Sequence, residues 1–228
     1  MNNQKYTTLL FDADNTLLDF FAAEARAIEI TCKHFNIPFS KEVGKLYSDI
    51  NDSFWKRFEK GEIKREEINV GRFAKFAQIM KSDVDATAMA SFYVEELSNG
   101  NMIIEGADRL CEALSKKYDM YIVTNGHASV QKRRFGTSPL PQYFKKSFIS
   151  EEIGRRKPEK EYFDLVFKEL SEKDKSKICI IGDSMSSDIL GGINAGIDTC
   201  FYNRLGLPKI YEPTYEVKNF DEMLELFE

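Results

Sequence analysis

The feature that most constrains this chain is a series of short apolar runs, most of which end in polar residues and are followed by a helix-like stretch. Runs of this kind cover residues 6–11, 120–124, 146–149, 177–181 and 198–201. A run that is apolar throughout is typical of a strand buried on both faces. Because helices of about ten residues separate the later runs, the pattern predicts an α/β fold with a parallel sheet covered on both faces.

The stretch between the first and second runs has a different texture, since it is rich in helix formers and has no convincing strand. The pattern predicts helices at 21–29, 53–60, 65–80 and 85–97. Breaks are expected at Asn36-Ile37-Pro38, at Gly61 and at Ser82-Asp83. We therefore expect a core domain formed by residues 1–16 and 99–228, with residues 17–98 inserted as an all-helical cap.

Composition excludes several classes of protein. The chain has 228 residues and a formal net charge of -5, which gives no electrostatic reason to expect nucleic-acid binding. The basic run Lys132-Arg133-Arg134 could be a phosphate contact, but it is predicted to be a solvated helix face. No run approaches the roughly 20 apolar residues of a membrane span, and the start lacks signal-peptide features, so cytoplasmic residence is expected. The four cysteines form no Cys-x-x-Cys pair and are predicted to be buried thiols.

Polar groups follow three of the predicted strands at the point where each strand ends. They are Asp12 with Asp14, Thr124 with Asn125, and Asp183. In parallel sheets, ligands bind outside the carboxyl ends of the strands, so these groups are expected to meet there.

The chemistry of these groups fits phosphoryl transfer. Of the two carboxylates, Asp12 and Asp14, one could attack phosphorus and the other could carry protons. An anionic nucleophile that approaches an anionic phosphate needs countercharge, which a divalent metal with oxygen ligands supplies. Mg²⁺ commonly takes one or two protein carboxylates, a number that Asp12 and Asp183 satisfy, and Asp188 adds another carboxylate nearby.

Two further groups could hold the phosphate. Lys157, which precedes Pro158 and a predicted helix, is an additional cation, and the Thr124 hydroxyl could bind a phosphoryl oxygen beside the backbone amides of Asn125 and Gly126. Each piece alone is usually surface charge, a turn or a helix cap. The ordered combination at predicted strand ends is much less ordinary.

This ordered set closely resembles the haloacid dehalogenase-like hydrolase superfamily. The motifs are Asp12-Ala13-Asp14-Asn15-Thr16-Leu17, Thr124-Asn125-Gly126, Lys157-Pro158, and Gly182-Asp183-Ser184-Met185-Ser186-Ser187-Asp188. The resemblance implies a Rossmann-like doubly wound core and a Mg²⁺ cofactor. It implies Asp12 as nucleophile and metal ligand, and Asp14 as general acid/base that also binds the metal through its backbone carbonyl.

The remaining roles follow from the same resemblance. Thr124, Asn125 and Lys157 would hold the phosphoryl group, Asp183 would be a metal ligand, and Asp188 would support the metal shell. The acidic Asp14 argues for phosphoryl chemistry, because the true dehalogenases of the superfamily lack an acid at that position and use no metal.

Finer details resemble the bacterial pyrimidine 5′-nucleotidases of the superfamily. The supporting segments are 7–20, 50–55, 121–126 and 213–216. The resemblance implies a small-molecule phosphate monoester as substrate, a nucleoside 5′-monophosphate with a pyrimidine base preferred. Residues 133–141 depart from the usual superfamily pattern, which leaves the local geometry there unpredicted.

Specificity is expected in the cap. Asn51 and Trp55 would share a helix face, where Asn51 could bond a base edge and Trp55 could stack on a base, while Arg72 could pair with a phosphate or a base carbonyl. The alternatives are core packing for Trp55 and an interhelix ion pair for Arg72. At the level of the whole chain, the open alternatives are a sugar-phosphate phosphatase, a phosphomutase with the same core, and a catalytically idle binding protein.

Overall fold

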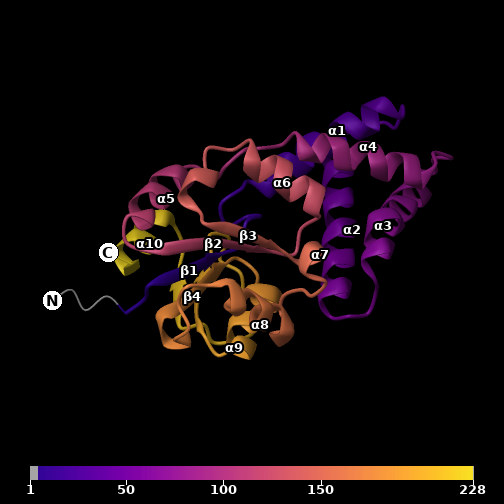
Figure 1. The fold of residues 1–228 in the computed structure, drawn as a ribbon. Helices are drawn as coiled ribbons and strands as arrows, with labels where there is room; N and C mark the ends of the chain where they lie inside the picture. Colours follow the sequence, from indigo (N-terminus) through magenta and orange to yellow (C-terminus); the bar gives the residue numbers. More distant parts are fainter. Residues whose placement is uncertain (1–4, 228) are drawn as a thin grey trace. The chain divides into compact units, whose positions relative to one another are not determined.

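A computed structural model of the protein describes residues 5–227 (Figure 1). Its contacts divide the chain into two compact units, one with the residues up to Asp19 and from Ile103 onward, the other with residues 20–102. These boundaries lie three and four residues beyond the sequence-based ones at 16/17 and 98/99. The difference arises because Leu18 still pairs with the first unit, through isolated bridges to Asp14 and Ile103.

The first unit contains a parallel sheet with helices between its strands. Within the described residues the strands are β1 (Thr8–Phe11), β2 (Asp119–Thr124), β3 (Lys146–Ile149), β4 (Ile178–Gly182), β5 (Asp198–Tyr202) and β6 (Tyr215–Val217). The helices are α5 (Ala107–Ser115), α6 (Ala128–Gly136), α7 (Ser150–Ile153), α8 (Lys160–Glu169), α9 (Leu190–Ala195) and α10 (Phe220–Phe227). Short 3₁₀ turns cover Pro141–Tyr143 and Lys175–Lys177, and a π-helical turn covers Met185–Ile189.

The strand order is β3-β2-β1-β4-β5-β6, and all neighbouring strands are parallel. The chain moves from β1 to β2 and β3 on one side, then crosses to β4 on the other side of β1. The order therefore reverses between β1 and β4, which is where ligands bind in open α/β sheets. The predicted α/β fold is confirmed.

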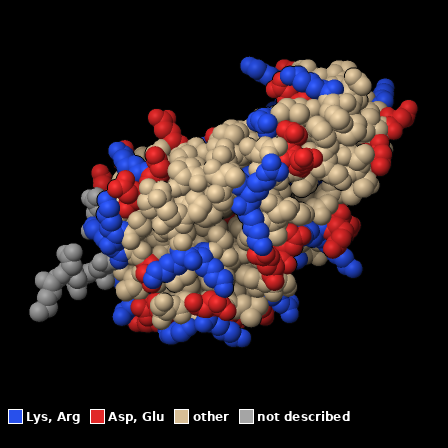
Figure 2. Space-filling model, turned by 45° about the horizontal axis from the view of Figure 1, so that its top comes forward, with Lys and Arg blue, Asp and Glu red and all other residues tan. Residues whose placement is uncertain are grey.

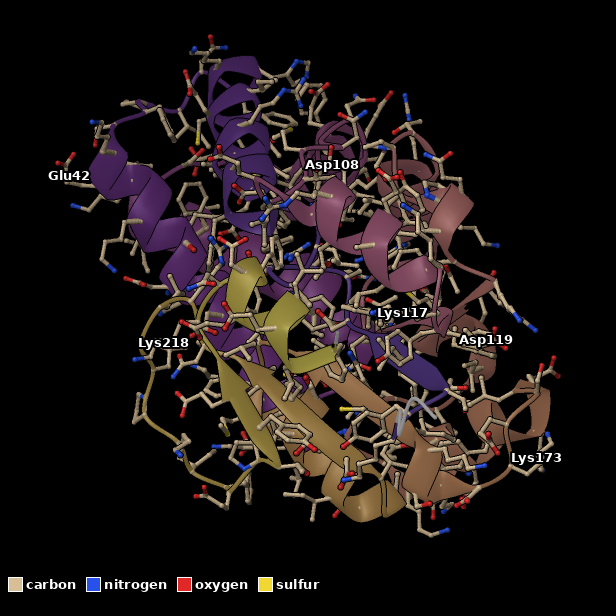
Figure 3. All side chains as sticks on the ribbon, turned by 90° about the vertical axis from the view of Figure 1, so that its left-hand side faces the viewer. Glu42, Asp108, Lys117, Asp119, Lys173 and Lys218 are labelled. Carbon is tan, nitrogen blue, oxygen red and sulfur yellow. The ribbon has the colours of Figure 1, made fainter. Side chains whose placement is uncertain are left out.

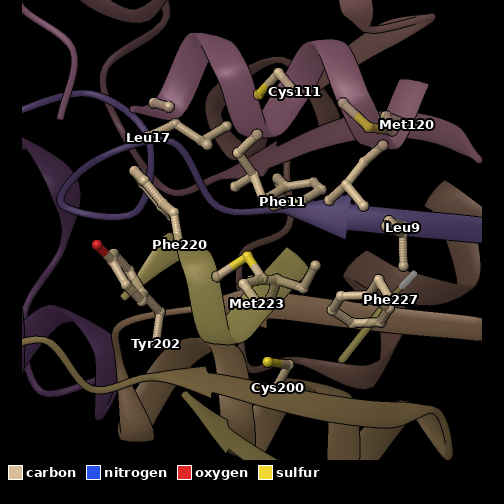
Figure 4. Packing of buried hydrophobic residues seen from close by; sticks show 14 of the residues in the cluster. Leu9, Phe11, Leu17, Cys111, Met120, Cys200, Tyr202, Phe220, Met223 and Phe227 are labelled. Carbon is tan, nitrogen blue, oxygen red and sulfur yellow. The ribbon is translucent and has the colours of Figure 1, made fainter. Parts of the chain in front are cut away.

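Successive residues of each central strand enter cores on opposite faces of the sheet. Leu9 and Phe11 of β1 pack with the helices α5 and α10, whereas Leu10 packs with α8 and α9. Figure 4 shows the first of these cores, with Leu9, Phe11 and Cys111 gathered above Met223 of α10. Burial on both faces explains why the strand sequences are continuously apolar. The four cysteines are buried free thiols, as predicted.

The second unit is all helical within residues 20–102. Its helices are α1 (Phe20–His34), α2 (Lys41–Glu59), α3 (Arg65–Met80) and α4 (Ala86–Ser98). Each predicted helix is present, but α2 begins twelve residues before the predicted range 53–60, and α1 continues five residues beyond the predicted range 21–29. Ser40 caps the start of α2, since its side chain accepts a hydrogen bond from the Val43 N–H, and Asp85 caps the start of α4 by accepting one from the Thr87 N–H. Packed aromatic rings of Tyr47, Phe73 and Tyr93 join α2, α3 and α4.

Charged side chains lie mainly on the outside. Both signs are interspersed on the face drawn in Figure 2, and Asp108, Lys117 and Lys173, which are labelled in Figure 3, are exposed. Within residues 5–227, no helix is both long and apolar enough to cross a bilayer. Buried ionic side chains are therefore exceptions among the described residues. Glu24 and Arg72 are buried in the helical unit, and the others, Asp12, Arg134, Lys157 and Asp188, are found around the carboxyl ends of β1 and β4.

Candidate active site

Asp12 is the first residue after β1, and the sheet fixes its position. Its backbone N–H donates to the carbonyl oxygen of Ile181 at 2.9 Å, so it follows the register in which Phe11 faces Ile181 of β4. The chain then turns sharply through Asn15, whose φ of 58° is a left-handed conformation that asparagine tolerates. Asp12 thus lies at the carboxyl end of a parallel strand, as the sequence predicted, and at the point where the strand order reverses.

Three carboxylates converge there. Asp12, Asp183 and Asp188 each offer an oxygen, and these oxygens lie within 4.8 Å of one another. Burial raises the pKa of the Asp12 carboxyl to about 7, although Lys157 opposes the shift. Burial, followed by the neighbouring charges of Asp12 and Asp188, raises the pKa of Asp183 well above its ordinary value. A cation bound among the three carboxylates would therefore stabilise their ionised forms.

The donor set fits a hard divalent ion. All three donors are carboxylate oxygens, the ligand type that Mg²⁺ and Ca²⁺ prefer. When ionised, the three carboxylates exceed the single ammonium group of Lys157 by two negative charges, which a divalent ion would balance. These residues could therefore hold a metal.

The π-helical turn Met185–Ile189 places Asp188. Ser184 precedes the turn, and its backbone N–H donates to Asp188 Oδ2 at 3.1 Å. A β-carbon on Gly182 would lie 2.2 Å from the same oxygen. Glycine at the end of β4 is therefore what leaves room for Asp188 to reach back to the strand. Such π-helical turns often occur at functional sites.

Lys157 is the cation within the acidic cluster. Its Nζ lies 2.6 Å from Asp12 Oδ1 and 2.6 Å from Asp188 Oδ1, and it also donates to the Val123 carbonyl at 2.7 Å. The side chain is 1% exposed. Burial alone would lower its pKa, but the Asp12 and Asp188 carboxylates outweigh burial and raise it. The ammonium group is therefore held charged between two of the three carboxylates.

The Thr124-Asn125-Gly126 motif follows β2 and fixes the lysine. Asn125 Nδ2 donates to the Lys157 carbonyl at 2.8 Å, and the Lys157 N–H donates to Asn125 Oδ1 at 2.9 Å. The Thr124 hydroxyl accepts a hydrogen bond from the Gly126 N–H at 3.1 Å. The side chain of Asn125 therefore binds the Lys157 backbone. The predicted contact between Asn125 and phosphate would instead come from the backbone amide of Asn125.

Three polar residues of the site were missed from the sequence. The Thr16 hydroxyl lies 3.4 Å from both Asp12 Oδ2 and Asp183 Oδ1, and it belonged to the first motif without a role of its own. Gln131 and Arg134 both donate to the Asp14 carboxylate. Arg134 had been predicted to lie on a solvated helix face, which is wrong, because its side chain is fully buried. Its partner lies about 120 residues away in the chain, beyond the reach of local pattern.

The helical unit gathers two of the three predicted specificity residues. Arg72 donates to Asn51 Oδ1, and Asn51 donates to Glu24 Oε1 at 2.7 Å. Both are buried, whereas the half-buried Trp55 stacks edge-on against Phe58 in a separate apolar cluster. The contacts agree with the packing alternative for Trp55, and the substrate-binding role of all three residues stays a prediction.

Comparisons with known proteins agree with this geometry. A family model described as haloacid dehalogenase-like hydrolase matches residues 6–196. The chain belongs to this family, which confirms the resemblance drawn from the four motifs.

Individual relatives cover nearly the whole chain. Pyrimidine 5′-nucleotidase PynA of Streptococcus pneumoniae (strain ATCC BAA-255 / R6) is 34% identical over 96% of this chain and 94% of its own length. Pyrimidine 5′-nucleotidase YjjG of Escherichia coli (strain K12) is 30% identical over 97% and 98%.

YfnB of Bacillus subtilis (strain 168), whose name gives only the class HAD-hydrolase, is 38% identical over 98% of this chain and 96% of its own length. Its crystal structure, bound to magnesium, superposes with a TM-score of 0.94 and covers 98% of this chain and 99% of that one. Family, fold and site together define the chain as a phosphatase, a hydrolase of phosphoric monoesters.

Proposed function

We propose that the protein is a magnesium-dependent phosphatase that hydrolyses nucleoside 5′-monophosphates, with pyrimidine bases preferred, through an aspartyl-phosphate intermediate. The observation that carries the proposal is the placement of Asp12. It is buried after β1, 2.6 Å from the Lys157 ammonium group, and it shares an acidic cluster with Asp183 and Asp188. The names of PynA and YjjG support the choice of substrate.

In the first step a carboxylate oxygen of Asp12 attacks phosphorus, and the bond from phosphorus to the 5′ oxygen breaks. The leaving oxygen takes the proton of the Asp14 carboxyl group, so the nucleoside departs as a neutral alcohol. Lys157 and the Thr124 hydroxyl hold the phosphoryl oxygens, as does the backbone amide of Asn125. The products of this step are the nucleoside and the phosphorylated side chain of Asp12.

In the second step the ionised Asp14 takes a proton from water as the water oxygen bonds to phosphorus. The bond between phosphorus and Asp12 breaks, which releases inorganic phosphate and restores both carboxyl groups to their starting states. A Mg²⁺ ion held by Asp12, Asp183, Asp188 and the backbone carbonyl of Asp14 would supply the positive charge that offsets the phosphate and the carboxylates.

The test is phosphate release over a panel of esters, with magnesium and with EDTA. The panel holds UMP, dTMP, AMP, GMP, a hexose phosphate and a triose phosphate. We expect the pyrimidine nucleotides to have the highest kcat/KM, EDTA to stop turnover, and added Mg²⁺ to restore it. Activity unaffected by EDTA would overturn the metal assignment. A sugar phosphate that exceeds every nucleotide, or an isomerised product, would overturn the substrate assignment.

The same panel tests the predicted specificity residues. Trp55→Ala should raise KM for UMP and leave the Mg²⁺ requirement unchanged if this ring stacks on the base. The matched control is Phe54→Ala, since Phe54 is also half-buried and packs against the same apolar cluster. Equal KM values for the two variants and the unaltered protein would contradict the stacking role.

A further inference from the structure

One face of α6 is aimed at Asp14. Gln131 and Arg134 lie three residues apart on this helix, and both are buried. The Gln131 amide nitrogen donates to Asp14 Oδ2, and the Arg134 guanidinium donates to Asp14 Oδ1. Each oxygen of the carboxylate therefore has its own donor, and the two donors come from a single rigid element.

The neighbouring residues on α6 show that the burial is specific to this face. Lys132 and Arg133 are exposed, and Lys132 pairs with Glu152. Arg134, with the same basic character, is 0% exposed in its side chain. An arginine is buried only where its charge is paired, because desolvation of an unpaired guanidinium costs several kcal/mol. Its carboxylate partner is Asp14, at the carboxyl end of β1.

The turn before α6 makes room for this arrangement. A β-carbon on Gly126 would lie 2.1 Å from Gln131 Nε2 and 2.6 Å from Gln131 Cγ. Glycine at the third position of the Thr124-Asn125-Gly126 motif therefore lets the Gln131 side chain pass close to the turn on its way to Asp14. The motif that fixes Lys157 through Asn125 also admits the side chain that holds Asp14.

We propose that Gln131 and Arg134 are positioning residues that set the orientation of the Asp14 carboxyl group. The inference rests on the proposed function, in which Asp14 gives a proton to the leaving oxygen and later takes one from water. A carboxyl held at both oxygens by α6 cannot rotate freely, so the proton meets the leaving group in one geometry. Neither residue touches the phosphoryl group in this role.

The role has a kinetic signature that depends on the leaving group. A nucleoside leaves as a poor alkoxide and needs the proton, whereas p-nitrophenolate leaves readily without one. We therefore compare UMP with p-nitrophenyl phosphate, both with Mg²⁺, in Gln131→Met, Arg134→Met and Arg134→Lys. Asp14→Asn supplies the reference for loss of the proton carrier. The control is Arg133→Met, because Arg133 directly precedes Arg134 in the chain and is exposed.

We expect Arg134→Met and Gln131→Met to lower kcat/KM for UMP, which covers only the steps up to formation of the aspartyl-phosphate, by about 10- to 100-fold, and to change KM less than about threefold. The fall for p-nitrophenyl phosphate should be at least about fivefold smaller. Arg134→Lys should recover part of the loss, and Arg133→Met should match the unaltered protein. In the Asp14→Asn background, Arg134→Met and Gln131→Met should cost nothing further.

The outcomes separate the inference from the function on which it rests. If the unaltered protein hydrolyses the esters but the variants lose kcat/KM equally for both substrates, or lose activity independently of Asp14→Asn, the positioning role is overturned. If the unaltered protein hydrolyses neither ester, the proposed function is overturned. Should Arg134→Met fail to fold, Gln131→Met gives the same comparison, because it retains the buried ion pair.

Discussion

The Nζ of Lys157 lies 2.6 Å from Oδ1 of Asp12, although 145 residues separate them in the chain. The contact exists because β1 and β2 are parallel neighbours that end side by side, and because Asn125 holds the Lys157 backbone from the end of β2. It places a positive charge against the carboxylate that would attack an anionic ester. The same contact makes Lys157 a structural element, since two buried carboxylates depend on it.

Removal of Lys157 should therefore damage both stability and catalysis. Lys157→Met leaves Asp12 and Asp188 without their buried cation, and breaking a buried pair costs about 3–5 kcal/mol. Urea unfolding without metal measures the loss. The control is Lys160→Met, because Lys160 also lies 2.6 Å from a carboxylate, that of Asp164, but the pair is exposed. The control should lose less than about 1 kcal/mol; equal losses would contradict the structural role.

Gly182 is predicted to be intolerant of a methyl group. Gly182→Ala places a β-carbon against Asp188 Oδ2, so the carboxylate must move. Overpacking of this kind costs about 1–3 kcal/mol of stability. The displaced Asp188 should also reduce the rise in Tm that Mg²⁺ produces. Gly136→Ala is the matched control. Gly136 ends α6, and a β-carbon there would meet no other heavy atom of residues 5–227 within 4 Å beyond its own helix backbone and chain neighbours. That variant should be neutral or stabilised by about 0.5–1 kcal/mol.

Asp183→Asn should stabilise the metal-free protein while it weakens metal binding. Burial and two neighbouring carboxylates raise the pKa of Asp183, so its ionised form is unfavourable in the folded state. Loss of this charge should add about 0.5–2 kcal/mol to the free energy of unfolding, as replacement of functional charges often does. Denaturation in EDTA and with Mg²⁺ measures both effects. A variant that is less stable in EDTA, yet still stabilised by Mg²⁺ as before, would contradict the assignment.

Stabilisation by magnesium should depend on pH. The pKa of Asp12 is raised from 3.8 to about 7 in the folded state, chiefly by burial, so between these values the folded state binds the proton more tightly than the unfolded chain. The stability of the metal-free protein should fall as pH rises from about 4 to about 7 and then level off. Mg²⁺ needs the ionised carboxylate, so its effect on Tm should grow as pH rises through about 7.

The measurement is the difference in Tm between the protein with Mg²⁺ and the protein with EDTA, taken at about pH 6 and at about pH 8. The larger difference is expected at the higher pH, and Asp12→Asn should remove the contribution of this group. A larger difference at the lower pH, where the proton competes with the metal, would contradict the account of Asp12.

The central strands of the sheet were predictable from sequence because burial on both faces makes each of them a continuous apolar run. The ends of β1 and β4 were also predictable, since Asp12 and Asp183 interrupt such runs abruptly. The boundaries between the two units were less predictable from the sequence. Leu18 pairs with Ile103 by backbone bridging, and backbone pairing between distant segments leaves little mark on residue type.

Buried polar contacts were the least predictable part of the site. Arg134 stands in a basic run whose other members are solvated, and only the fold brings Asp14 to it. Similarly, Asn51 and Arg72 were singled out, but their bond to each other depends on how α2 and α3 pack. Sequence pattern tells which face of a helix is apolar, and it is silent about a charge whose partner lies in another element.

The most direct test of the central claim is the site of phosphorylation on the protein. Asp14→Asn is mixed with Mg²⁺ and p-nitrophenyl phosphate, whose leaving group needs no acid, then quenched and reduced with borohydride, which converts an aspartyl-phosphate to homoserine. Peptide mass spectrometry should find homoserine at position 12, and none in Asp12→Asn, whose turnover should fall by on the order of 10⁴-fold or more. Homoserine at another position, or undiminished turnover in Asp12→Asn, would contradict the claim.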